Sequence, residues 1–417
     1  MMLQKASLFK INKYTIGYFL ACAYIFTSYV AQDILISSRL NSLCMYAFLF
    51  MSAFLFIQSV RFDVARAGFA IWYLAFMVIS VALMLQSPSF SGVFDSFYSM
   101  IVSFLIALCL QLYIKTEKGF RGICWCYSLS SVVFILLLYL TGNLSGSADD
   151  RLGQTVLGNA NIFAMMMMVG VMFSIWLLIY DCPKKLQKIL MTAIVIFEMY
   201  SLVLSGGRKF FIVPFIFLYI LLWFKEDKRG RRHIIFYTIL FAALLFGVVW
   251  LIMNVPTLYN AIGVRMEGFV QNLMGEGGDS SSAIRETIRH LAWDKWWDRV
   301  FFGYGFDSFK YLAEQEVGHF YYSHCNYTEL LYSGGIFYLI LYYGFYVALL
   351  WKALMRRHIA VPYRAFSVGV VLCFLVFDYG AVTYNGTLTV ILLMLANSVT
   401  FFETPSEKCL KGEMAHE

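Results

Sequence analysis

The sequence is poor in charged residues. Asp, Glu, Lys and Arg together make up 14% of its 417 residues, whereas 61% are hydrophobic. Soluble domains carry roughly 25% charged residues. So little charge excludes an ordinary soluble domain and indicates an integral membrane protein.

Several catalytic signatures are absent as well. The sequence has no Gly-x-x-x-x-Gly-Lys-Ser/Thr phosphate loop, no His-Glu-x-x-His pair and no Gly-x-Ser-x-Gly elbow. The first expected outer loop has Asp33 as its only acidic residue, so it lacks the acidic metal motif of many metal-dependent lipid-sugar transferases. We therefore expect neither a metal ion nor another cofactor.

Long hydrophobic runs occupy most of the chain instead. A helix that spans a bilayer needs about 20 apolar residues, and roughly twelve segments meet this length. The expected fold is an all-α polytopic membrane protein with spans at 14–31, 40–60, 67–85, 93–114, 120–141, 156–180, 187–205, 209–224, 233–253, 329–351, 363–383 and 386–402.

The basic residues predict how the chain is oriented. Most of the Lys and Arg residues fall in the N-terminal segment, in alternate loops and in the C-terminal tail. Short basic loops of membrane proteins face the cytoplasm, so both termini are expected to be cytoplasmic. The net charge of +7 thus reflects topology, and it indicates no nucleic-acid partner.

One outer loop differs from the others. Residues 254–328, between the ninth and tenth expected spans, are too polar to cross the membrane and too long for a simple connector. The chain therefore divides into nine spans within 1–253, this extracytoplasmic loop, and three spans with a cytoplasmic tail within 329–417. Helical spacing of apolar residues over 283–300 predicts an amphipathic loop helix. Its tryptophans, Trp293, Trp296 and Trp297, are typical of a membrane interface.

Two groups of cations on the outer side are candidates for binding an anion. Arg208 and Lys209 follow the break at 205–207 and begin a helix, where cations oppose the helix dipole. A helix start with two cations suits a phosphate group, although pairing with lipid headgroups is the alternative. Arg285 and Arg289 share one helix face and could clamp a pyrophosphate, although a solvated charged face is the alternative. Arg265 is a further candidate.

A histidine lies near the end of the long loop. His324 is followed by Asn326 and Glu329, just before the tenth expected span. A histidine there could act as a general base near neutral pH, or could simply be an interfacial side chain. Asn326 or Glu329 could fix its tautomer or bind a sugar hydroxyl.

Four sequence motifs resemble those of the O-antigen ligase/polymerase superfamily. Each is weak alone, but they follow the family's order over about two-thirds of the chain. Gly207 replaces the family's usual second Ser, and Cys325 stands where Asn or Ser is frequent; neither departure removes an ionisable group. The motifs are Arg151-Leu152-Gly153 with Asn159-Ala160-Asn161, Ser205-Gly206-Gly207-Arg208, Ser281-Ser282-x-x-Arg285, and Gly303-Tyr304-Gly305 with Ser323-His324-Cys325-Asn326 and Gly334-Gly335.

The resemblance implies glycosyl transfer at the outer face of a bacterial cell membrane. The donor would be an oligosaccharide on polyprenyl pyrophosphate, and transfer would proceed with inversion and without metal. The resemblance assigns His324, Arg208 and Arg285 to catalysis. We further expect Lys209, Arg265, Arg289, Asn326, Glu329 and Arg151 to bind substrate. The other implied partners are a glycan acceptor, the lipid bilayer and a chain-length regulator.

Three functions remain to be distinguished. A polymerase joins lipid-linked repeat units into capsule, exopolysaccharide or O-antigen, and we favour it because richness in Phe, Lys and Tyr suggests a Gram-positive source without lipid A–core. A ligase would transfer the finished glycan to lipid A–core, teichoic acid or protein. A flippase for the same lipid would need charged residues within its spans. Only Glu198 and Asp378 stand out there, and Asp378 either lines the outer cavity or pairs helices.

Overall fold

The computed structural model describes residues 12–32, 36–58, 66–143, 151–225, 231–274 and 280–404. Asp33, the N-terminal segment before residue 12 and the basic tail after residue 404 lie outside the described residues. The described part of the chain is helical and contains no β-strand, only an isolated bridge between Ile359 and Glu403. The expected all-α class is confirmed.

The first half of the chain forms helices joined mostly by short loops. Ser89 and Thr116 cap two of them, because each side-chain oxygen accepts the backbone N–H of the third residue onward. The elements are α1 (Lys13–Val30), α2 (Ser38–Gln58), α3 (Gly68–Met84), α4 (Phe90–Gln111), α5 (Glu117–Leu140), α6 (Gln154–Leu157), α7 (Ala160–Tyr180), α8 (Lys185–Leu204) and α9 (Arg208–Lys225).

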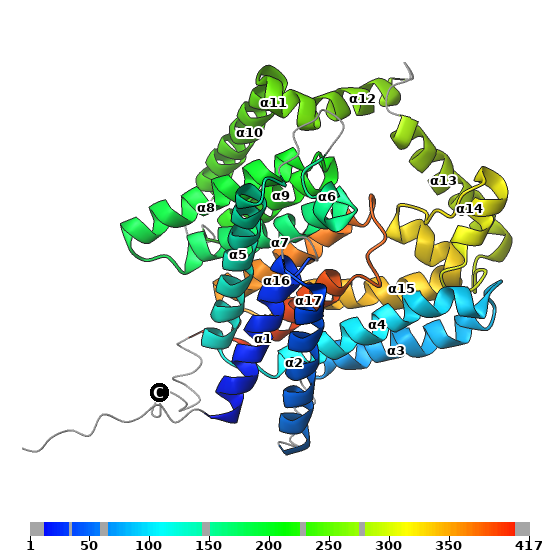
Figure 1. The fold of residues 1–417 in the computed structure, drawn as a ribbon, viewed down its shortest axis with the longest axis horizontal. Coiled ribbons are helices and arrows are strands. Elements are labelled where there is room, and N and C mark those ends of the chain that lie inside the picture. The colour runs from blue at the N-terminus through cyan, green and yellow to red at the C-terminus, as the bar shows by residue number, and fades with distance from the viewer. Residues whose placement is uncertain are drawn as a thin grey trace, which may run out of the picture.

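The second half contains the long loop and the last helices. Figure 1 shows α10, α11 and α12 arching over the bundle and leading to α13 and α14 at one side. The elements are α10 (Arg231–Asn254), α11 (Pro256–Leu258), the π-helical η1 (Tyr259–Gly263), α12 (Val264–Leu273), α13 (Ser280–Trp296), η2 (Trp297–Arg299), α14 (Phe309–Val317), α15 (Asn326–Met355), α16 (Val361–Phe377), α17 (Thr387–Ser398) and η3 (Val399–Phe401).

Each of the twelve expected spans coincides with a helix, but fewer helices meet a strict test for crossing a bilayer. Among the described residues, six helices are long and apolar enough, namely α2, α4, α5, α7, α8 and α15, and a bent pair around Asn254 raises the number to seven. The bend between α10 and the following segment is 92°. Helices α3, α16 and α17 are apolar but shorter. A multi-pass membrane protein is thus supported, while the number twelve stays a prediction.

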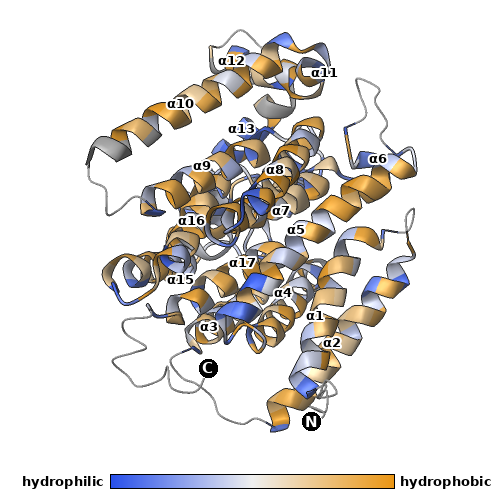
Figure 2. Ribbon diagram, turned by 90° about the vertical axis from the view of Figure 1, so that its left-hand side faces the viewer, coloured by the Kyte–Doolittle hydropathy of each residue, from blue (hydrophilic) through white to orange (hydrophobic). Residues whose placement is uncertain are grey.

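The helix α7 lies at the centre of the bundle. It packs against α5, α8 and α9, and most of its residues are buried. Aromatic rings from α5, α7 and α16 meet edge to face at Phe120, Trp176 and Phe366. Hydrophobic residues also run along the outer helices, α10 among them (Figure 2), as expected where lipid rather than water surrounds the protein.

A backbone junction fixes the long loop to α15. The N–H groups of Tyr304 and Gly305 each donate to a carbonyl of α15, at 2.8 Å to Tyr332 and Ser333. Gly335 interrupts α15 with a φ of +70°, and a Cβ there would come within 2.3 Å of the Phe301 backbone. Glycine is therefore required, and the Gly-Tyr-Gly and Gly-Gly motifs are two sides of one contact.

Candidate functional site

The turn between α8 and α9 is the base of a cation cluster. Gly206 has a φ of +66°, and a Cβ there would meet Ala261 O at 2.9 Å and Arg151 Nε at 3.3 Å. The Arg151 Nε donates to Ser205 O at 2.7 Å, and its Nη2 donates to Asn161 Oδ1 at 3.1 Å. Glycine at this turn thus lets Arg151 and the η1 segment approach the backbone closely.

The long loop brings another arginine to the same turn. The Arg208 guanidinium donates to the backbone carbonyl of Arg265, the second residue of α12. This contact holds α12 over the start of α9. The residue that we expected at a phosphate site and the loop residue named as its helper are therefore neighbours.

Electrostatics show that four arginines converge. The pKa of Arg151 falls to about 10, chiefly because the side chain is partly buried and then because Arg265, Arg285 and Arg208 repel its charge. These arginines come from four segments of the sequence. Among the described residues, the groups that act on Arg151 are cations, so they give this place the electrostatic character of an anion site.

Helix α13 supplies two of the cations. It packs on α15 through Ile288 and Ala292, both fully buried, and Arg285 and Arg289 lie on the adjoining part of its surface. The Arg289 guanidinium lies 4.7 Å from the centre of the Tyr379 ring. Within the part of the chain that the structure describes, neither arginine forms an ion pair with a carboxylate.

Lys209 is held by groups other than acids. Its Nζ donates to the carbonyl of Gly380 and lies 5.2 Å and 5.5 Å from the ring centres of Phe210 and Phe377. A carbonyl oxygen and two ring faces partly compensate the charge. This carbonyl and these two rings come from α9 and from the segment after Val361, so Lys209 connects the start of α9 to the loop that follows α16.

His324 faces these cations. Burial lowers its pKa to about 3, with Arg285, Lys209 and Arg289 adding repulsion. The imidazole is thus neutral at physiological pH and could accept a proton. Its backbone has a φ of +58°, a left-handed conformation that non-glycine residues seldom adopt and that is common at functional sites. No described residue forms a hydrogen bond with the ring, whose centre lies 4.3 Å from that of Tyr322.

Asn326 and Glu329 have intramolecular partners. Both side chains are buried, with 0% and 1% exposure. Glu329 Oε2 accepts the Ser323 N–H at 2.8 Å, and Asn326 contacts the loop at 378–386. Sequence reasoning expected both to bind substrate, and that expectation stays a prediction. Glu329 thus contacts the backbone next to His324, whereas Asn326 contacts the neighbouring loop and the Tyr343 hydroxyl of α15.

The loop at 378–386 was not foreseen as part of the site. Tyr379 lies under Arg289, and the Gly380 carbonyl accepts from Lys209. The only sequence signal was Asp378, a carboxylate within an apolar run. Tyr322, which is 47% exposed beside His324, was likewise not singled out.

The described residues contain no group of three or more His, Cys, Asp or Glu that could hold a metal ion.

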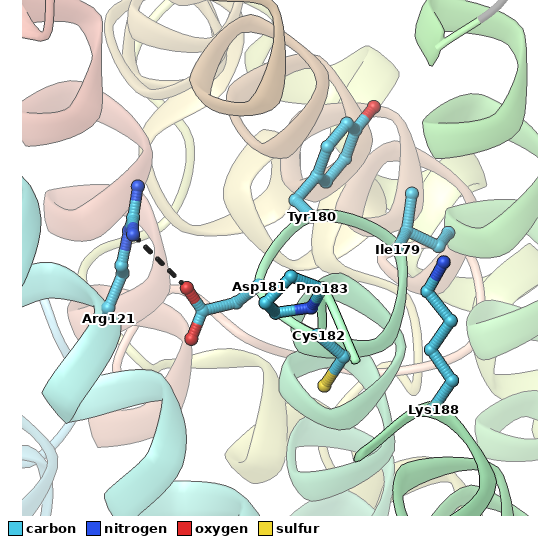
Figure 3. A pocket seen from close by; sticks show the side chains of 7 residues that line it. All are labelled: Arg121, Ile179, Tyr180, Asp181, Cys182, Pro183 and Lys188. Carbon is cyan, nitrogen blue, oxygen red and sulfur yellow. Dashed lines mark ion pairs between the residues drawn. The ribbon is translucent and has the colours of Figure 1, made fainter. Parts of the chain in front are cut away.

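A cavity of about 420 Å³ lies elsewhere, lined by Arg121, Asp181, Cys182 and Lys188 among others (Figure 3). It is at the C-terminal end of α7, whereas Asn161 and Arg151 mark the other end. The helix has 21 residues, so roughly 30 Å separate the two ends at 1.5 Å per residue. The cavity is distinct from the cation cluster.

The fold and site thus describe a helical membrane protein with a cationic centre at one end of its helices. Residues 190–343 match the family model of the O-antigen ligases. This segment includes Arg208, Arg265, Arg285 and His324, and the match supports the resemblance to the O-antigen ligase/polymerase superfamily. A comparison with curated protein sequences gave no match. The family implies a membrane enzyme of the glycosyltransferase type.

Proposed function

We propose that this protein polymerises lipid-linked oligosaccharide repeat units into a surface polysaccharide. The observation that carries the proposal is the convergence of Arg151, Arg208, Arg265 and Arg285 beside a neutral His324. Such a group suits a strongly anionic substrate with a hydroxyl that must lose a proton. A glycan on polyprenyl pyrophosphate, attacked by a sugar hydroxyl, has both properties.

The arginines would bind the donor pyrophosphate. Guanidinium groups pair with phosphate oxygens through two parallel hydrogen bonds, and such charge-assisted bonds are strong. Negative charge grows on the pyrophosphate as the bond to the sugar breaks. Arg208 and Arg285, assisted by Lys209, Arg265 and Arg289, would stabilise that charge in the transition state.

His324 would act as the general base toward the acceptor hydroxyl. With the site empty, burial and then the nearby cations hold its pKa at about 3, which makes it a weak base. A bound pyrophosphate would offset those cations and raise the pKa toward the range of an effective base. Donor binding would thus activate His324, and transfer would proceed in one step with inversion.

The site would face the outside of a bacterial cell membrane. Basic loops on the opposite side favour cytoplasmic termini. The exposed apolar surfaces of the helices would hold the prenyl chain of the donor within the bilayer. The pyrophosphate would then lie at the membrane surface beside the arginine cluster.

Purified protein in lipid nanodiscs, given polyprenyl-pyrophosphate repeat units with a labelled sugar, tests the proposal. A ladder of longer glycans that remain on the carrier lipid would support a polymerase. Label that moves only to an added acceptor, such as lipid A–core or teichoic acid, would indicate a ligase. Unchanged substrate that crosses the bilayer of proteoliposomes would indicate a flippase and overturn the proposal.

A further inference from the structure

The side chain of Asn326 joins the His324 turn to the loop at 378–386. Its Oδ1 accepts the backbone N–H groups of Thr383 at 3.0 Å and Tyr384 at 3.2 Å. Its Nδ2 donates to Tyr343 OH at 3.0 Å. The backbone N–H of Asn326 donates to the carbonyl of Asp378 at 2.7 Å. One residue thus makes four hydrogen bonds, three of them to that loop.

The loop at 378–386 is itself tied down from inside the bundle. The Asp378 carboxylate accepts from Thr383 Oγ1 at 2.6 Å and from Tyr343 OH at 2.8 Å. Tyr343 therefore bonds to both Asn326 and Asp378. This closed ring of hydrogen bonds fixes the loop against the first turn of α15, two residues after His324.

The same loop carries contacts for two of the cations that face His324. The Gly380 carbonyl accepts from Lys209, and the Tyr379 ring lies beneath Arg289. A shift of the loop relative to the His324 turn would disturb the contacts that hold both cations near the imidazole. The distance between base and cations therefore depends on the joint that Asn326 forms.

We propose that Asn326 is a positioning residue, which sets the distance between His324 and the cations Lys209 and Arg289 by joining the two loops that carry or orient them. The inference deepens the proposed function and depends on it for its catalytic meaning. Direct contact between Asn326 and substrate is disfavoured, because the side chain is 0% exposed and its amide oxygen and nitrogen already have partners.

An asparagine suits this position for a specific reason. The joint needs an acceptor for two backbone N–H groups and a donor for a phenol oxygen, within one short side chain. A carboxamide supplies both. Leucine has a similar volume but no polar atoms, so it would leave the N–H groups of Thr383 and Tyr384 buried without partners.

The test follows the reactivity of His324 toward diethyl pyrocarbonate, read by mass spectrometry across pH. The reagent attacks only neutral imidazole, so the pH at which reactivity falls reports how strongly nearby charges act on the ring. The groups that face it are Arg285 and Arg289 from α13, Lys209 from α9 and Tyr322 from its own turn. This measurement does not require glycan transfer.

We expect wild-type His324 to stay reactive well below pH 5. In Asn326→Leu the loss of reactivity should move up by at least one pH unit, toward the behaviour of an ordinary histidine. The value of kcat should fall about 10- to 100-fold, with the KM of the donor changed less than threefold, as expected when geometry rather than binding is lost. Tyr343→Phe, which removes one partner of Asn326, should shift both quantities in the same direction by less.

Asn397→Leu is the matched control, because Asn397 is also buried but lies at the far end of α17. It should leave the His324 profile and kcat unchanged.

An unshifted profile in both Asn326→Leu and Tyr343→Phe would overturn the proposal. A raised KM at constant kcat would also overturn it, because that result indicates substrate contact. If Asn326→Leu does not fold, Tyr343→Phe decides alone. If Asn326→Leu shifts the His324 profile but the wild-type protein transfers no glycan, the proposed function is refuted and the positioning role is retained.

Discussion

The two ends of α7 treat charge in opposite ways. At its C-terminal end, Asp181 pairs with Arg121 at 3.2 Å (Figure 3). Asp181 also accepts from Trp125 Nε1 at 2.9 Å, and Glu117 lies 3.5 Å from the same arginine. At its N-terminal end, the described charges that act on Arg151 are other arginines, namely Arg265, Arg285 and Arg208. Both ends carry arginine, but Arg121 pairs with carboxylates, whereas Arg151 lies among other arginines.

The difference separates structural charge from functional charge. An arginine paired with carboxylates contributes modestly to stability when it is exposed. Cations that lie close together repel one another, and this repulsion destabilises the protein when no ligand is bound. Such an arrangement is explained when an anionic ligand supplies the missing charge.

Loss of the base should produce the largest effect. His324→Ala is expected to reduce the rate of glycan transfer by about 10²- to 10⁴-fold, the usual contribution of general base catalysis. Binding of the donor, measured with a fluorescent polyprenyl-pyrophosphate glycan, should change little. A His324→Ala protein that still makes long polymer at normal expression would remove His324 from catalysis.

Replacing one arginine by alanine at each end of α7 tests the comparison directly. Arg285→Ala should lower kcat/KM about 100-fold or more, because a charge-assisted contact to the pyrophosphate is lost in the transition state. Arg285→Lys should recover only part, since lysine cannot form the two parallel bonds.

At the other end, Arg121→Ala should leave kcat/KM within twofold of wild type. Its ion pair is 45% exposed on the arginine side, so thermal unfolding should show a loss of less than about 1 kcal/mol. Equal loss of activity in Arg121→Ala and Arg285→Ala would contradict the distinction between the two ends.

The backbone junction between the long loop and α15 can be disrupted separately. Gly335→Ala places a Cβ within 2.3 Å of the Phe301 backbone at a φ of +70°. It should lower the thermal stability of the detergent-solubilised protein by more than the roughly 1–2 kcal/mol that a left-handed alanine costs alone. Gly318→Ala is the matched control, because its φ is +79° with nothing within 4 Å. Equal destabilisation in both variants would mean that the junction does not restrict the backbone.

The smallest expected effect concerns pH. Arg289 is the last of the cations that lower the pKa of His324, after Arg285 and Lys209. In Arg289→Leu the pKa should rise from about 3 toward 6.5, so the protonated, inactive form appears at higher pH. The acid limb of kcat/KM should therefore move to higher pH by a fraction of a unit, whereas Arg289→Lys should keep the wild-type limb. A shift to lower pH would contradict this electrostatic account.

Much of this architecture could be predicted from hydrophobic patterning. Every expected span coincides with a helix, because a run of apolar residues in a membrane must satisfy its own backbone hydrogen bonds. Cations at the start of α9, against the helix dipole, drew attention to the segment where Arg208 contacts α12 and Lys209 contacts Gly380. Neither signal could predict the 92° bend after α10. The backbone that follows this bend lies against the turn at Gly206.

The residues around His324 show what the sequence pattern could not predict. Asn326 and Glu329 stand close to a histidine in the sequence, which suggested contact with substrate. Both side chains are buried. The Asn326 side chain accepts from a loop more than fifty positions later in the chain, and Glu329 accepts the N–H of Ser323. Tyr379 and Gly380 carried no chemical signal at all, because a ring face and a carbonyl oxygen become relevant only when a cation is placed against them.

The sequence by itself determined that the chain is an all-helical membrane protein, that its polar loop at 254–328 is exceptional, and which ionisable side chains are unusual for their position. Only the tertiary structure decided which of these share one site. Helix formation depends on neighbours along the chain, whereas the field at His324 depends on Arg285, Lys209 and Arg289 from two other helices. Coulomb interactions act through space, and their partners are known only once the chain has folded.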